Sequence, residues 1–171
     1  MEPMDPVDLQ DPAEPDQEGR TARRGVCWPA VARGAGVGLA VLIGVATLRA
    51  VLDDNVEDFA DSGWTIPLFV LLLVGYLLAG WVAQRHAAEQ GMGDAPYTQG
   101  ALAGIGAFAC WIPLRVGIWL VRDEDRGLVS GSNGALRPGQ LFGALVISAG
   151  VGLIGALVAA RRTAARSDVQ P

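Results

Sequence analysis

The sequence has no lysine, one histidine and two cysteines among its 171 residues, and only 6% of the residues are aromatic. All 13 basic residues are arginines, which keep their charge in almost any environment, so none of them is a candidate proton carrier. The lone histidine, His86, and the two distant cysteines, Cys27 and Cys110, have no metal-site spacing and predict no disulfide. The sequence therefore predicts no catalytic residue, no metal ligand and no cofactor-binding residue.

A basic surface stripe is also lacking, which argues against nucleic acid as a partner. The net charge is −5, and seven of the 18 acidic residues lie within the first 18 positions. Residues 1–24 are rich in Pro, Asp and Glu, and such a segment cannot bury enough apolar surface to offset the entropy of ordering. We expect a disordered acidic tail on the cytoplasmic side. Its acidic start is unlike the basic start of a secretory signal peptide.

Charges are nearly absent from four long apolar runs. Each run is about as long as a helix that crosses the roughly 30 Å hydrocarbon core of a bilayer. In hydrocarbon each backbone group must find its partner within its own segment, which favours helices. The sequence therefore predicts an all-α membrane protein whose lipid-embedded domain covers 25–162, followed by a short cytoplasmic tail at 163–171. The four transmembrane helices are expected at about 34–52, 65–83, 98–121 and 141–160.

The arginines are unevenly distributed between the segments that flank these runs. Both tails and the central loop together contain eight arginines, the two other loops contain four, and Arg115 lies within the third run. Because basic residues accumulate in cytoplasmic segments, we expect a multi-pass protein of the cell membrane with both termini in the cytoplasm.

The two halves of the chain share a pattern. Residues 82–88 and 158–165 both combine alanine with arginine at the end of an apolar run, and both preceding loops are acidic. Two tandem helical hairpins would produce this pattern as a parallel repeat. Membrane helices of similar composition would also produce it without duplication, so both origins stay open.

Small residues recur at intervals of four along the apolar runs. The first run has Gly34 and Gly38, then Ala40 and Gly44. A spacing of four places residues on one helix face, where small side chains allow close approach of a second helix in lipid. Such a face serves either packing within one bundle or contact with a second copy or another membrane protein. The predicted packing face of the fourth run consists of Ala144, Ser148, Gly152 and Ala156.

Arg115 is a charge inside an apolar run, which is costly in lipid and marks a candidate functional residue. Trp111 and Trp119 lie four residues to either side, on the same helix face, where the guanidinium can stack on an indole. Arg115 either extends towards the interface beside these aromatic residues or faces an anion within a bundle or pore. Its candidate partners are acidic loop residues: Asp123, or Glu57, Asp58 and Asp61 across the bundle.

Three further features have structural interpretations. The acidic segment 53–61 is expected to form a short helix at the membrane surface. His86 is expected to be an ordinary polar group at a helix C-terminus, where cations are favourable. Cys110 is expected to be a small core residue, because free cysteine behaves as a buried apolar side chain.

Three segments carry a resemblance to known proteins: GWVAQRHAA, PYTQGALAGIGAF and AGVGLIGALVAARR. Over about residues 25–165 the chain resembles uncharacterised small four-helix integral membrane proteins of GC-rich bacteria, in particular actinobacteria. The resemblance implies a bacterial membrane protein and supplies no site residues.

The sequence has helix faces of small residues and no group of residues suited to catalysis, and this combination favours a non-enzymatic role. We expect the protein to act by helix packing, in a homo-oligomer or as an accessory of a larger membrane complex, with the lipid bilayer as its surroundings. The alternative is a small oligomeric transporter or channel with Arg115 in the permeation path.

Overall fold

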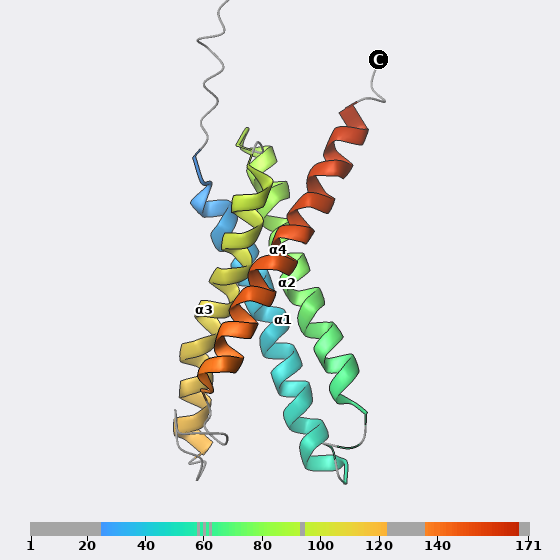
Figure 1. Cartoon of the computed structure of the whole chain (residues 1–171), viewed down its shortest axis with the longest axis vertical. Coiled ribbons are helices and arrows are strands. Elements are labelled where there is room, and N and C mark those ends of the chain that lie inside the picture. Colours follow the sequence, from blue (N-terminus) through green and yellow to red (C-terminus); the bar gives the residue numbers. More distant parts are fainter. Residues whose placement is uncertain are drawn as a thin grey trace, which may run out of the picture.

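The computed structural model describes residues 25–57, 59, 61, 63–92, 95–122 and 136–167, and these residues form four α-helices and no strand. All four helices are long and apolar enough to cross a membrane. The predicted all-α fold with four transmembrane helices is therefore confirmed. The helices are α1 (Trp28–Asn55), α2 (Thr65–Glu89), α3 (Pro96–Arg122) and α4 (Pro138–Ser167), and Figure 1 shows them as one bundle.

The helices extend beyond the apolar runs. α1 begins at Trp28, with a proline in its first turn, where a missing N–H costs little. α4 continues through Ser167, so residues 163–167, assigned to a tail from the sequence, are helical. Helical hydrogen bonds do not end where the hydrocarbon ends, which is why hydropathy alone shortens each helix. The predicted tail at 1–24 lies outside the described residues.

The segment after α1 differs from its prediction. The acidic residues Asp53 and Asp54 belong to the last turn of α1, which ends at Asn55. The described residues between Asn55 and Thr65 form turns and bends rather than a separate surface helix, and Gly63 has a φ of 75°. The described acidic residues of the segment are divided between the last turn of α1 and these turns, so the acidic spacing alone was a misleading signal.

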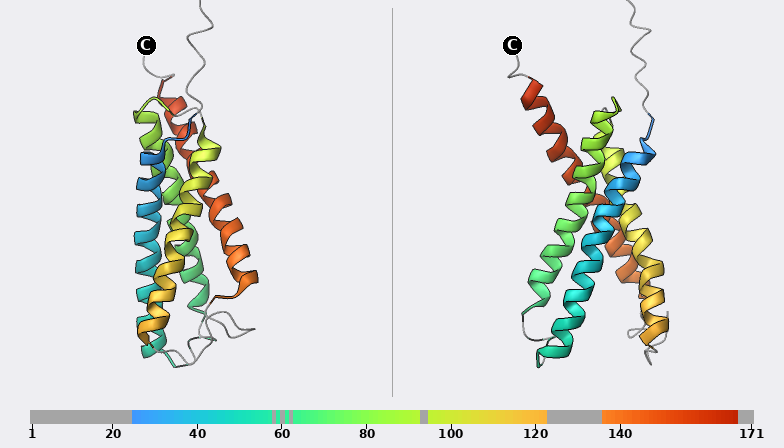
Figure 2. Two further views of the ribbon diagram at one scale, coloured as in Figure 1. Left: turned by 90° about the vertical axis from the view of Figure 1, so that its left-hand side faces the viewer. Right: turned by 180° about the vertical axis from the view of Figure 1, so that it is seen from behind.

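The helix termini are divided evenly between the two ends of the bundle. α1 begins, α2 ends, α3 begins and α4 ends at one end of the bundle, and α1 ends, α2 begins, α3 ends and α4 begins at the opposite end (Figures 1 and 2). The chain therefore crosses the bundle an even number of times. This places the start of α1 and the end of α4 on the same side, as two helical hairpins require.

α2 and α3 form the centre of the bundle. Each contacts the other and both outer helices, whereas α1 and α4 do not touch one another within the described residues. α1 and α2 lean one way and α3 and α4 the other, so the bundle is X-shaped when viewed from the front or the back (Figures 1 and 2). Helices that follow one another in the chain also pack against one another. α2 and α3 join the two hairpins, because each of them contacts both helices of the other hairpin.

Small side chains fill the interior. Ala79, Ala83 and Ala103 are completely buried and form one cluster between α2 and α3. Many large apolar side chains lie on the outside, where hydrocarbon solvates them as well as a protein interior does. This distribution, together with the four long apolar helices, identifies a multi-pass membrane protein. The exposed large side chains of the two outer helices include Val37, Ile43, Leu48, Val51, Phe142, Val146, Ile147 and Ile154.

Candidate functional site

The predicted packing face of α4 lies inside the bundle. Ser148 and Ala156 are completely buried, and Ala144 packs against the core cluster around Phe108. A Cβ atom on Gly152 would lie 2.5 Å from the carbonyl oxygen of Gly100 on α3, so only glycine fits there. The face is therefore occupied by this chain's own helices.

The small residues of α1 divide into two faces. Gly34 and Gly38 point inward, where a Cβ on Gly38 would meet the Cβ atoms of Ala79 and Ala107 at 2.9 and 3.0 Å. A second set is exposed, and an added Cβ at its two glycines would meet nothing within 4 Å. We call this set the open α1 stripe: Ala32, Gly36, Ala40 and Gly44.

Arg115 is half-buried near the far end of α3, as are Trp111 and Trp119. Within the described part of the chain Arg115 makes neither an ion pair nor a cation–π contact. The cation–π contact that the described residues do contain joins Arg85 to Trp81, with 5.6 Å between the guanidinium carbon and the ring centroid. The predicted partner Asp123 lies outside the described residues.

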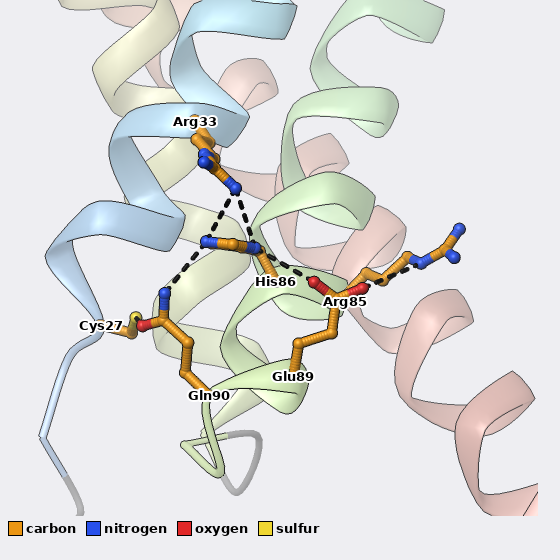
Figure 3. A network of polar contacts seen from close by, with 6 residues as sticks. All are labelled: Cys27, Arg33, Arg85, His86, Glu89 and Gln90. Carbon is orange, nitrogen blue, oxygen red and sulfur yellow. Dashed lines mark hydrogen bonds and ion pairs between the residues drawn. The ribbon is translucent and has the colours of Figure 1, made fainter.

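A polar cluster joins the start of α1 to the end of α2, as Figure 3 shows. It brings Arg33 to His86, which is 53 positions away in the sequence, and Cys27 to Gln90, which is 63 positions away. We call it the terminal polar cluster, and its members are Cys27, Arg33, Arg85, His86, Glu89 and Gln90.

The end of α2 positions one half of this cluster. Gly91 has a φ of 71°, which favours glycine, and its N–H bonds to the carbonyl of Ala88 at 3.0 Å. The N–H of Met92 bonds to the carbonyl of Ala87 at 2.9 Å, which completes a Schellman motif. This turn fixes Gln90 as the C-cap and packs Met92 against the apolar cluster that contains Cys27.

Only one assignment of donors and acceptors fits the terminal polar cluster as the side chains are placed. The Cys27 thiol donates to Gln90 Oε1 at 2.9 Å, so the other amide atom, Nε2, faces His86 Nε2 at 3.0 Å. Because an amide nitrogen only donates, His86 Nε2 must accept. The ring proton is therefore on Nδ1, which donates to Glu89 Oε2 at 3.2 Å. The whole arrangement requires a neutral imidazole.

The charged groups around this chain of bonds lie at the surface. Arg33 Nη1 lies 3.3 Å from His86 Nδ1 and 3.1 Å from Nε2, and Arg33 has no carboxylate partner among the described residues. Arg85 Nε lies 3.5 Å from Glu89 Oε1, and both side chains are more than half exposed. The thiol of Cys27, in contrast, is 1% exposed.

The two cysteines lie in different environments. Cys110 is exposed on the outer surface of α3, so its prediction as a core residue is wrong, and Cys27 is the buried one. A small apolar side chain is equally soluble in lipid and in a helix interface, which leaves its burial unspecified by sequence. Sequence reasoning also missed the link between Cys27 and Gln90. Pairing the start of the first run with the end of the second, as a hairpin requires, was the signal that could have found it.

Comparisons with known proteins do not assign the chain to a family. No family model matches the chain, and no curated protein or solved structure gives a significant match. The identification therefore rests on the helices themselves: the chain is a multi-pass membrane protein with four candidate spanning helices in the part that the structure describes.

Proposed function

We propose that this protein is a non-enzymatic component of a bacterial cell membrane that acts by helix packing, with both termini in the cytoplasm. Its partner is a second copy of the chain or a helix of a larger membrane complex. The observation that supports this proposal is the open α1 stripe, a small-residue face that the other three helices leave uncovered.

The open α1 stripe differs from the other small-residue faces in having no occupant. Gly34 and Gly38 are used against α2 and α3, and the α4 face is used against the same two helices. Gly36, Ala40 and Gly44 repeat the four-residue spacing on the outer surface. Small residues at this spacing allow a second backbone to approach closely, which drives helix association in lipid.

Filling the open α1 stripe is expected to weaken self-association. Gly36→Leu adds bulk where nothing lies within 4 Å, so the bundle itself should stay folded. We expect the dissociation constant of the oligomer to rise about tenfold or more, the effect of losing about 1.4 kcal/mol of packing. Analytical ultracentrifugation in mild detergent measures it.

Gly150→Leu is the matched control, because Gly150 is also open but lies on α4, away from the stripe. It should leave the association unchanged. A strictly monomeric wild type without a co-purifying membrane protein would contradict the packing role. An oligomer that tolerates Gly36→Leu would place the contact on another face.

The placement of Arg115 favours a second candidate, an oligomeric transporter or channel. Its side chain is half-buried and makes no ion pair within the described residues, so a charge is available to an anion. The centre of the single bundle is filled by the buried Ala79, Ala83 and Ala103. A permeation path would therefore run between copies rather than through one copy.

Anion flux through proteoliposomes tests the transport candidate. If Arg115 attracts the permeating anion, Arg115→Gln should reduce flux at least about tenfold, since a charge-assisted contact contributes about 1.5–3 kcal/mol. Arg49→Gln is the control, because Arg49 is exposed near the same end of the bundle on α1. Equal flux in both variants and in empty liposomes would exclude the transport role and leave the packing role intact.

A further inference from the structure

We propose that Cys27, Gln90 and His86 form a proton-operated latch that joins the first turn of α1 to the end of α2. The amide of Gln90 connects the buried thiol to the imidazole, and in its present orientation it can bond to both only while His86 is neutral. Figure 3 shows the three side chains in a row between the two helices.

The present orientation is consistent only with neutral His86. Gln90 Nε2 donates to His86 Nε2, while Gln90 Oε1 accepts the S–H of Cys27. When His86 is protonated, both ring nitrogens are donors. Two N–H groups then oppose each other at 3.0 Å, and the amide must turn so that its oxygen faces the ring.

Turning the amide removes the acceptor of the thiol. Gln90 Nε2 then faces Cys27 and can donate only to its sulfur, a weak acceptor, while the S–H has no acceptor left on this amide. Cys27 is 1% exposed, so water cannot replace the lost partner without an opening of the first turn. The protonation of His86 is thereby transmitted to a residue that it does not touch.

The charged side chains around the His86 ring also favour loosening of α1 from α2 when the ring is protonated. Arg33 Nη1, from α1, lies 3.1–3.3 Å from the two ring nitrogens and is repelled when the ring gains a charge. Glu89, from α2, faces Nδ1 and is attracted, and Arg85 shares that carboxylate. Protonation therefore strengthens the contacts within α2 and weakens both polar contacts between α2 and α1.

Apolar contacts limit the size of the change. Cys27 and Ala30 also pack against Ala87 and Met92, and these contacts do not depend on charge. The expected response is a local opening of the first turn of α1, not separation of the helices. Because imidazole is the side chain that ordinarily changes charge between about pH 5 and pH 8, this range is where the latch should be tested.

The reactivity of Cys27 reports the latch directly. We would use the full-length chain in liposomes with Cys110→Ser, which leaves Cys27 as its single thiol. A pyridyl disulfide reagent, which reacts with thiols in acid as well as at neutral pH, gives the labelling rate at about pH 5 and pH 8. The measured quantity is the ratio of the two rates relative to the same ratio in the variants.

His86→Gln is the matched variant, because a glutamine at this position cannot take up a proton. We expect the acid-to-neutral rate ratio of the wild type to exceed that of His86→Gln about fivefold, the factor that one ordinary hydrogen bond contributes. Gln90→Met removes the bridge and should make Cys27 react faster at neutral pH than in the wild type, with an acid-to-neutral ratio like that of His86→Gln.

Two results would overturn the latch. Identical pH ratios in the wild type and His86→Gln would show that His86 does not control the thiol. A Cys27 that stays as slow in Gln90→Met as in the wild type at neutral pH would show that the amide does not hold it. Both readouts are independent of oligomeric state and of flux, so they do not depend on the proposed function.

Discussion

Gly152→Leu is expected to destabilise the bundle strongly. A Cβ at this position would lie 2.5 Å from the carbonyl oxygen of Gly100 and 3.2 Å from the Cα of Gly104. Both obstacles are backbone atoms of α3, which cannot turn aside as a flexible side chain can. The backbone of Gly152 also lies against α2, since a Cβ on Gly80 would clash with it. A side chain on Gly152 itself is directed at α3, so the substitution must push α4 away from α3.

The expected destabilisation is about 3 kcal/mol or more, the upper part of the range for overpacked cores. Unfolding in mixed detergent micelles of increasing denaturing detergent content measures it. Gly150→Leu is the control, since it adds the same side chain on the same helix where nothing lies within 4 Å. Equal stability of the two variants would mean that α4 does not cross α2 and α3 at Gly152.

Val74→Arg is expected to disturb the membrane insertion of α2. Val74 is at the midpoint of the apolar run 65–83, and its side chain is 42% exposed on the outer surface of the bundle. An arginine at the centre of a spanning helix makes insertion less favourable by about 2.5–3.5 kcal/mol. A charge at this position cannot reach either interface without a distortion of the bilayer. The fraction of inserted helix, measured by glycosylation mapping of an engineered site, should fall strongly.

Thr65→Arg is the matched control for this experiment, because Thr65 begins α2 and its side chain can extend into the polar layer. It should insert as the wild type does. Equal insertion of both variants would mean that the outer surface of α2 around Val74 faces water or another protein rather than hydrocarbon. That result would also reposition the lipid boundary of the bundle.

Much of the fold could be predicted from the sequence, and the reason is the solvent. Hydrocarbon offers no hydrogen-bond partner, so each apolar run of bilayer length has one regular solution, the helix. Four runs and their order led to the observed helices, with errors confined to their ends. The ends were harder because the polar layer permits both helix and loop. Asp53, for example, continues α1, although its spacing with Glu57 and Asp61 favoured a separate surface helix.

The candidate site was not predictable in the same way. Both Gly34 and Gly36 begin a series of small residues four apart, and lipid accepts either series on the outside. Likewise, the sequence could not distinguish the buried Cys27 from the exposed Cys110, because lipid and protein interiors are both apolar. In a soluble protein the contrast between water and core would have separated them.

The sequence by itself determined that this chain crosses a bilayer as helices, because burial of the backbone in hydrocarbon leaves no alternative. Only the tertiary structure decided which small-residue face is occupied, since that depends on the shapes of the neighbouring helices. It also decided that the imidazole of His86 and the thiol of Cys27 share one amide. Hydrogen-bond direction is a property of atoms placed side by side, and residues 63 positions apart acquire it only when α1 and α2 meet.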